Sequence, residues 1–213
     1  GHAQGVVRAA ALVPADRRDA TFEVMVGDAW LLRGDWDEAL RCYGRAARDT
    51  GPVPARIAWR TGLLHYLRGN LDDAAKAYEG GDGEDPDLAA RALLLGWSAS
   101  VRWLRGDLEA TRAYEAARTS GDNRALANAH TVLAMVAALD GDRGANDVHY
   151  LHALDHATAA RDVFQLIRIH TNRGSRQLEE GDCEGALVEV DLALRLADLA
   201  GFATFRGLAL SNR

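Results

Sequence analysis

The chain has 213 residues, 48% of them hydrophobic, which is enough for a buried core in one domain or in a continuous array of stacked units. Only four prolines occur, and Ala, Leu and Arg recur throughout, so we expect an all-α fold. The formal net charge of -6 and the scattered arginines argue against contact with nucleic acid. No apolar run approaches the roughly 20 residues of a membrane span and no signal sequence opens the chain, so we expect a cytoplasmic protein without membrane contact.

A Gly followed by Asp or Asn recurs along the chain and marks the predicted turns between helices. The pairs begin at Gly34, Gly69, Gly106, Gly141 and Gly181. The intervals between them are similar, and a period of roughly 35–40 residues is typical of stacked helical repeats. Gly takes the left-handed conformation that ends one helix, and the Asp or Asn side chain accepts hydrogen bonds from the N–H groups that open the next.

The turns divide the chain into helix pairs that we expect to form a single array over residues 1–213. Residues 5–13 look like the second helix of a truncated preceding unit. Five full units follow at about 20–53, 55–88, 92–125, 127–165 and 167–200, and half a unit begins at Ala203. The segment from Ala145 to Ala160 is longer than its counterpart from Ala110 to Ala117, so the second helix of the fourth unit is predicted to be longer by about two turns.

Two further features concern the boundaries of this array. The stretch from Gly80 to Pro86 has loop composition and lies between two units, so we expect a loose loop that does not separate domains. The chain opens with Gly1-His2 instead of methionine, and we expect it to be part of a larger protein.

The first two units resemble the tetratricopeptide repeat (TPR). The first reads Val26-Gly27, Trp30, Gly34-Asp35-Trp36, Ala39, Tyr43, Ala46 and Pro52, and the second repeats Gly62, Gly69-Asn70-Leu71, Ala74, Tyr78 and Pro86. The resemblance implies a right-handed superhelix of antiparallel helix pairs, about five and a half units long. Small residues would let the two helices of a unit approach while tyrosines fill the space beside them: Gly27, Gly62, Ala99, Ala134 and Gly174, with Tyr43, Tyr78 and Tyr114.

The later units are longer and suggest a narrower resemblance. Their length and segments such as Gly181-Asp182-Cys183-Glu184-Gly185-Ala186-Leu187 are similar to the C-terminal repeats of large ATP-binding LuxR-family regulators, common in bacterial antibiotic gene clusters. This resemblance implies an interaction or ligand-sensing domain for transcription regulation. The alternative is a free-standing scaffold or adaptor unrelated to transcription.

In TPR arrays the first helix of each unit lines the concave face and contacts the ligand. We therefore predict a groove that binds a protein or peptide, or a small apolar ligand. The middle of this groove is apolar and aromatic, and its charged residues would orient the bound ligand. The alternative is that the aromatic residues pack between units. The predicted groove residues are Asp28, Arg56, Trp59, Leu63, Tyr66, Ser100, Trp103, Asn128, Met135, Arg168 and Thr171.

Other kinds of site find little support in the sequence. There is no phosphate-binding loop, G-x-S-x-G elbow or H-E-x-x-H motif, so we expect no enzyme activity and no cofactor. Asp28 and Leu63 stand where a carboxylate-clamp TPR needs Asn. His149, His152 and His156 share one helix face, but no Cys or Glu joins them at ligand spacing, which favours a histidine-rich surface over a metal site.

Two last expectations concern the cysteines and the ends of the array. Cys42 and Cys183 lie inside separate helical patterns and are expected to be buried thiols. Apolar end helices favour a homodimer or contact with flanking domains. These residues are Val6, Val7, Ala10 and Val13 at one end and Phe202, Phe205, Leu208 and Leu210 at the other.

Overall fold

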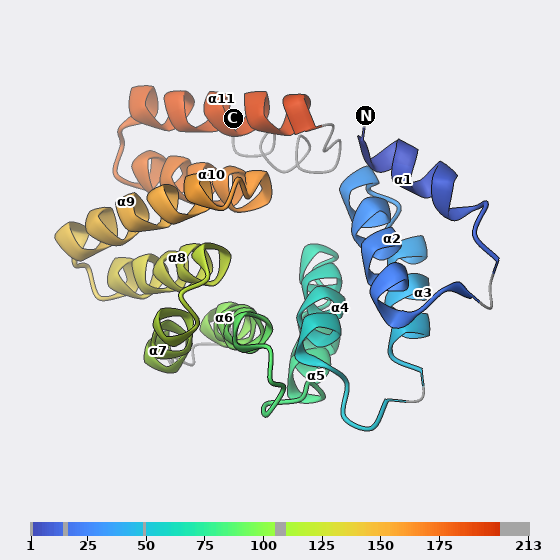
Figure 1. Cartoon of the computed structure of the whole chain (residues 1–213). Helices are drawn as coiled ribbons and strands as arrows, with labels where there is room; N and C mark the ends of the chain where they lie inside the picture. Colours follow the sequence, from blue (N-terminus) through green and yellow to red (C-terminus); the bar gives the residue numbers. More distant parts are fainter. Residues whose placement is uncertain (1, 15–16, 49, 105–109, 201–213) are drawn as a thin grey trace. The chain divides into compact units, whose positions relative to one another are not determined.

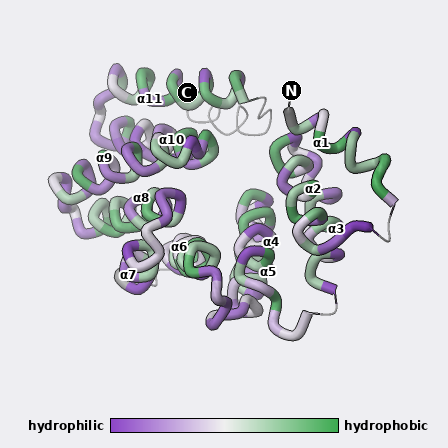
Figure 2. The backbone as a smooth tube through the Cα atoms, viewed as in Figure 1, coloured by the Kyte–Doolittle hydropathy of each residue, from purple (hydrophilic) through white to green (hydrophobic). Residues whose placement is uncertain are grey.

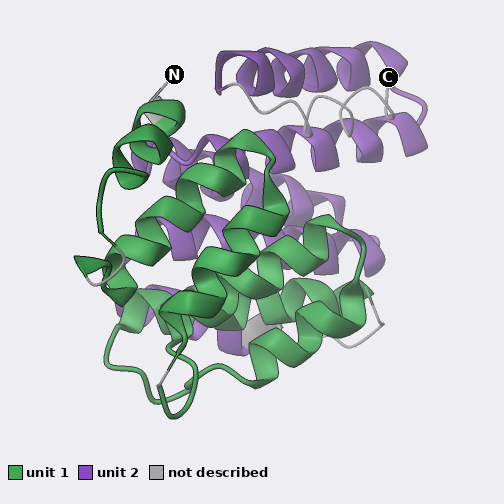
Figure 3. Cartoon of the chain, turned by 90° about the vertical axis from the view of Figure 1, so that its right-hand side faces the viewer, with its two compact units in different colours: residues 1–107 green, residues 108–213 purple. Residues whose placement is uncertain are grey.

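The computed structural model describes residues 2–14, 17–48, 50–104 and 110–200. Within these ranges it contains eleven α-helices and no strand, which confirms the predicted all-α, TPR-like fold (Figure 1). The chain divides into two compact units, residues 1–107 and residues 108–213 (Figure 3). The single array over the whole chain stays a prediction. No helix of the described residues has the length and apolar character that crossing a membrane requires.

The first unit holds six helices, of which four form the two predicted pairs. The helices are α1 (His2–Ala10), α2 (Ala20–Arg33), α3 (Trp36–Ala46), α4 (Ala55–Leu67), α5 (Leu71–Glu79) and α6 (Leu88–Leu104). Helix α6 begins shortly before the predicted start of its unit at 92. The apolar face of α1 is not fully exposed at the end of the array, because Ala10 is buried and packs with Val26 and Cys42. Leu12 just after it is 85% exposed.

The second unit contains α7 (Ala110–Ser120), α8 (Asn123–Leu139), α9 (Arg143–Ala159), α10 (Val163–Glu179) and α11 (Cys183–Ala200). Helix α9 has 17 residues and α7 has 11, so the longer second helix of the fourth unit is confirmed. Helices α8 to α11 start at the evenly spaced positions 123, 143, 163 and 183. Figure 1 shows them following one another as neighbours, and α8–α9, α9–α10 and α10–α11 are in contact.

The glycine turns have the geometry that the sequence predicts. Gly34, Gly69, Gly141 and Gly181 all have positive φ, between 73° and 84°. In each case the N–H of the following residue donates to a carbonyl five residues back, as Asp142 N does to Ala137 O at 2.9 Å. This is the Schellman motif, which satisfies the last carbonyls of a helix. Turn composition therefore fixes where these helices end.

A further turn of the same kind joins α9 to α10 without a glycine. Arg161 has a φ of 51°, and it is the only described non-glycine residue with positive φ. Asp162 N donates to Ala157 O at 2.9 Å, as in the glycine turns. Arg161 stands midway between Gly141 and Gly181 in the sequence, so it occupies the glycine position of this turn. The Gly-Asp pattern therefore does not mark this turn.

The residue after the turn glycine does not always cap the next helix with its side chain. Asp122, Asp142 and Asp162 accept hydrogen bonds from N–H groups three residues later, at 2.9, 2.9 and 3.1 Å. Asp35 and Asn70 make no such bond, which corrects the expectation for the first two units. Asp35 is paired with Arg33 at 3.1 Å instead.

The close approach of paired helices at the small residues is also confirmed. A Cβ added at Gly27 would lie 2.8 Å from Cδ1 of Tyr43, and one at Gly62 would lie 2.6 Å from Cδ1 of Tyr78. At Gly174 the nearest atom would be Cγ2 of Val190 at 3.0 Å. Tyr43 is fully buried, so its ring fills the space that the missing side chain leaves.

Each unit has its own apolar core, in which alanines bring the helices close together. Figure 2 shows hydrophobic and hydrophilic stretches alternating along the helices of both units. The core of the first unit includes Val24, Ala39, Tyr43, Ala46, Ile57 and Leu64. Clusters of the second unit comprise Ala127, Ala134, Tyr150, Ala153, Ala157 and Ile169, and Ile167, Ala193 and Ala197.

The loop between α5 and α6 is held in place, so the expectation of a loose loop was wrong. Asp82 N donates to Val53 O at 2.7 Å. The buried Asp85 accepts a hydrogen bond from Ala55 N at 2.8 Å. A Cβ on Gly81 would lie 2.8 Å from side-chain atoms of Ala58 and Leu94. The loop therefore packs against the start of α4 and against α6.

Some expectations fall outside the described residues. They are the turn at Gly106-Asp107, the half unit from Ala203, and the apolar end residues Phe202, Phe205, Leu208 and Leu210.

Candidate functional site

The predicted groove residue Asp28 lies at the centre of a polar cluster that joins α2, α3 and α4. Its Oδ1 accepts a hydrogen bond from the Tyr43 hydroxyl at 2.7 Å. Arg60 donates through Nε to Oδ1 at 2.7 Å and through Nη2 to Oδ2 at 2.9 Å. Burial, followed by the charge of Asp28, raises the pKa of Tyr43, which therefore stays a hydroxyl donor. A bidentate ion pair of this kind holds both the carboxylate and the guanidinium in a fixed orientation.

Arg60 is held from a second side by an aromatic ring. Its guanidinium carbon lies 4.2 Å from the centre of the Trp59 ring, and its Nη1 donates to Arg56 O at 2.8 Å. The Arg60 side chain is 14% exposed and that of Asp28 is 37% exposed. The pair therefore reaches the surface at Asp28, while Trp59, at 8% exposed, forms a buried support beneath Arg60.

The surface of α2 beside Asp28 is apolar. Met25 is 49% exposed and Leu32 is 42% exposed. Met25, Asp28 and Leu32 are three and four residues apart in the helix, so they share one face. The groove prediction did not include Met25 or Arg60. The sequence does show that they hold equivalent positions in successive units, because the interval from Met25 to Arg60 is the same as the one from Gly27 to Gly62.

The other predicted groove residues of the first unit are partly or fully buried. Leu63 is buried, and Arg56, Tyr66 and Trp103 have intermediate exposure. Tyr66 packs on Trp97 with ring centres 5.7 Å apart. Ser100 is fully buried, and its hydroxyl donates to Gly96 O at 3.0 Å. These residues help to pack α4 and α6, and only the partly exposed ones can touch a partner directly.

All predicted groove residues of the second unit are buried. Asn128 and Thr171 are 0% and 6% exposed, and Thr171 Oγ1 donates to Ile167 O at 2.8 Å. Arg168 reaches from α10 to α8, where its Nη2 lies 3.7 Å from Sδ of Met135. These four side chains are therefore buried between the helices of the second unit.

The three predicted histidines of α9 gather around a fourth that the sequence reasoning missed. The ring of His130, on α8, lies with its centre 5.3, 5.0 and 5.7 Å from those of His149, His152 and His156. Within the described part of the chain, no group of three or more His, Cys, Asp or Glu side chains is arranged to hold a metal ion.

A pocket of about 260 Å³ lies in the second unit, between the start of α9 and the end of α10. Three of its charged lining residues are paired: Arg176 with Asp147 at 2.7 Å, and Arg143 with Glu180 at 3.4 Å. Most of the charge around the pocket is therefore compensated. It is lined by Ala138, Gly141, Arg143, Asn146, Arg176, Glu179 and Glu180.

The two cysteines differ in their surroundings. Both are free thiols, and Cys42 is buried in α3 as predicted, whereas Cys183 is exposed at the start of α11. The expectation that both are buried was therefore wrong for Cys183, which is the first residue of its helix. Burial raises the pKa of Cys42 to about 11, so this thiol is protonated at neutral pH.

Comparison with known proteins agrees with the predicted fold of the first unit. A family model described as tetratricopeptide repeat matches residues 25–89. The matched segment contains most of α2, all of α3, α4 and α5, and the polar cluster around Asp28. A comparison with curated proteins gives no match. The chain is thus similar to tetratricopeptide repeat proteins over residues 25–89, and this match supports a TPR domain.

Proposed function

We propose that the chain is a non-catalytic repeat domain that binds a protein or peptide partner through the exposed face of α2 and the adjoining residues of α4. The observation that carries this proposal is a surface on which two exposed apolar side chains, Met25 and Leu32, flank the fixed carboxylate of Asp28. Repeats of this class serve as interaction scaffolds, and first helices supply the contacts.

The chemistry of this face suits an amphipathic segment. Met25 and Leu32 would bury apolar side chains of the partner, and the flexible thioether of Met adapts to different shapes. An ionised carboxylate offers about four acceptor positions. Asp28 uses three of them, on Tyr43 and Arg60, and a partner N–H or cation would take the fourth. Because Asp28 is already oriented, a partner would lose little entropy in meeting it.

The buried members of the predicted groove support this face. The Trp59 ring supports the Arg60 guanidinium, and Leu63 is buried on the same helix, α4. The predicted groove residues Asn128, Met135, Arg168 and Thr171 are buried in the second unit, so they are not part of the proposed face. A small apolar ligand in place of a peptide is the alternative occupant of the face on α2.

A narrower proposal is that the domain belongs to a LuxR-family transcriptional regulator of secondary metabolism and acts in the cytoplasm as a sensor. Its support is the repeat length: the even spacing of the starts of α8 to α11 makes two successive helices a unit of roughly 40 residues. A free-standing scaffold remains the alternative, and the homodimer stays a prediction. The parent gene decides between them, because the regulator requires flanking ATPase and helix-turn-helix segments.

The binding proposal can be tested with peptides selected from a random library against the immobilised chain. Their affinity is measured by fluorescence anisotropy for the wild type and for the double variant Met25→Lys/Leu32→Lys. Leu12→Lys is the control, because Leu12 is 85% exposed in the same unit but lies off α2. We expect the double variant to bind at least about tenfold more weakly, as for substitution of interface anchor residues, and the control to bind normally. Equal affinities for all three proteins, each with unchanged circular dichroism, would refute the proposed face.

A further inference from the structure

Four imidazole rings from two helices of the second unit form one cluster. His149, His152 and His156 are three and four residues apart on α9, so they share one face. His130 of α8 lies against all three, and its ring is nearly parallel to that of His156, at 9°. Tyr114 of α7 covers another side of His130, edge to face, with ring centres 5.2 Å apart. His130 is 7% exposed, so this ring is enclosed by its neighbours.

The hydrogen bond between His130 and His149 requires that at least one of the two rings is uncharged. Nδ1 of His130 and Nδ1 of His149 are 3.2 Å apart. One nitrogen must carry a hydrogen and the other must offer a lone pair, whereas both nitrogens of an imidazolium are donors. The bond is therefore lost when both rings are protonated. Nδ1 of His156 makes a separate bond of 2.9 Å with Oδ1 of Asn123.

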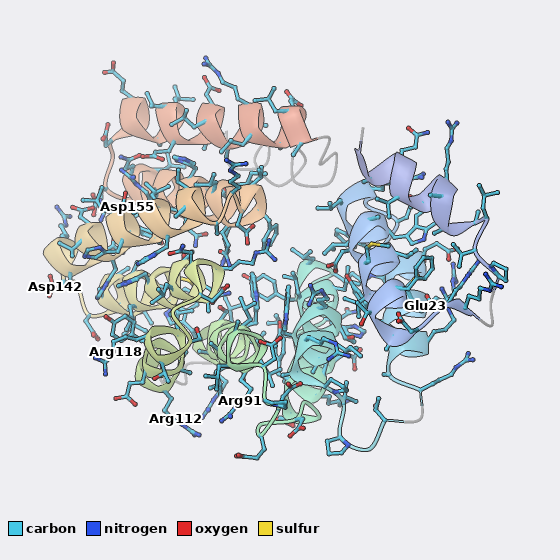
Figure 4. The ribbon with its side chains drawn as sticks, in the orientation of Figure 1. Glu23, Arg91, Arg112, Arg118, Asp142 and Asp155 are labelled. Carbon is cyan, nitrogen blue, oxygen red and sulfur yellow. The ribbon has the colours of Figure 1, made fainter. Side chains whose placement is uncertain are left out.

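The charges around the cluster do little to compensate added protons. Among the described residues, the titratable groups of α9 that act on His130 are the three other histidines, and the Tyr114 ring of α7 contacts it. Asp142, at the start of α9 (Figure 4), acts on His149 and favours its proton. Among the described residues, the only histidine in an ion pair is His170, with Glu189, outside the cluster.

Other charged side chains of these elements have partners outside the cluster. Arg124 of α8 pairs with Asp162 at 3.2 Å. Asp147 of α9 pairs with Arg176 at 2.7 Å. Arg112 and Arg118 of α7 extend away from α8 in Figure 4. Asp155 of α9 is exposed.

Burial, and then the three neighbouring histidines, lower the pKa of His130 to about 4. Burial, and then His152, lower the pKa of His149, while Asp142 opposes this.

We propose that this histidine cluster is an acid-sensitive switch, in which uncharged rings hold α8 against α9 at neutral pH and protonation loosens that contact in mildly acidic solution. The sign follows from the lowered pKa. The folded state binds the proton of His130 less well than the unfolded state does, so its stabilisation is present above about pH 6.5 and is lost as pH falls towards 4. A shift of this size corresponds to a change in the unfolding equilibrium constant of up to about 300-fold.

The experiment uses the full chain and two readouts. Histidine Cε1–H resonances are followed by NMR from pH 8 to pH 4, and urea unfolding is followed by far-UV circular dichroism at neutral pH and near pH 5. The variants are His130→Gln and His149→Gln, which keep a hydrogen-bonding side chain but do not titrate. His65→Gln, in the first unit, is the control.

We expect the His130 resonance to titrate well below the ordinary range, and the wild type and the His65 variant to lose stability on acidification. The His130 variant should lose clearly less, because the carboxylates that also respond to acid are the same in each protein. His149→Gln provides the same comparison if His130→Gln does not fold. An ordinary titration of His130, or an equal acid-induced loss in both cluster variants and the wild type, would overturn the proposal.

Discussion

The contact between α2 and α3 at Gly27 gives the sharpest prediction of stability. In Gly27→Ala, the new Cβ would lie 2.8 Å from Cδ1 of Tyr43. The ring cannot move aside easily, because it is fully buried and its hydroxyl is bonded to Asp28. Overpacking of this kind costs about 1–3 kcal/mol, and the better helix propensity of alanine returns roughly 0.8–1 kcal/mol. We therefore expect a net loss of up to about 2 kcal/mol in the free energy of unfolding.

The matched control is Gly44→Ala in α3. A Cβ there would meet nothing within 4 Å, so only helix propensity changes and a gain of about 0.5–1 kcal/mol follows. All five tryptophans lie in the first unit, so urea unfolding followed by tryptophan fluorescence reports on this unit. If Gly27→Ala stabilised the protein as Gly44→Ala does, the close approach at Gly27 and the repeat register built on it would be wrong.

Three further predictions concern the second unit and its turns. Arg161→Gly should raise the free energy of unfolding by about 0.5–1 kcal/mol, because it relieves a left-handed conformation that costs a non-glycine residue about 1–2 kcal/mol. Urea unfolding followed by far-UV circular dichroism measures this change, and a lower free energy of unfolding would contradict it. Asp142→Ala should cost about 1 kcal/mol by removing a helix cap, whereas Asp35→Ala, which removes no side-chain cap, should change stability by less than half as much in the same assay. Between pH 6.5 and pH 4, His130 should account for a loss of up to about 3 kcal/mol, measured as the difference between the wild type and His130→Gln.

Local sequence patterns predicted the parts of the fold that depend on backbone conformation and residue size. The turns at Gly34, Gly69, Gly141 and Gly181 follow from the need for positive φ, and only a few residue types meet it at low cost. The pairing of Gly27 with Tyr43 follows from a fixed repeat interval, since a small residue leaves space that a large one must fill. These signals lie within one unit and need no knowledge of long-range contacts.

Features that depend on which side chains meet across helices were harder to predict. The turn at Arg161 lacked the glycine signal, although its position midway between Gly141 and Gly181 is visible in the sequence. His130 and His149 lie on the two helices of one predicted unit, but the pattern of small and large residues does not show which polar side chains meet there. Asn128 and Arg168 are polar, and a first-helix position suggested exposure, but they are packed inside the second unit.

We expect the face of α2 with the adjoining part of α4 to bind a partner. The most direct measurement is amide hydrogen exchange of the full chain with and without a peptide selected against it. Exchange should be slower in α2 (Ala20–Arg33) and α4 (Ala55–Leu67) when the peptide is bound, with the second unit unchanged. Protection confined to α8–α11, or to neither unit, would contradict it.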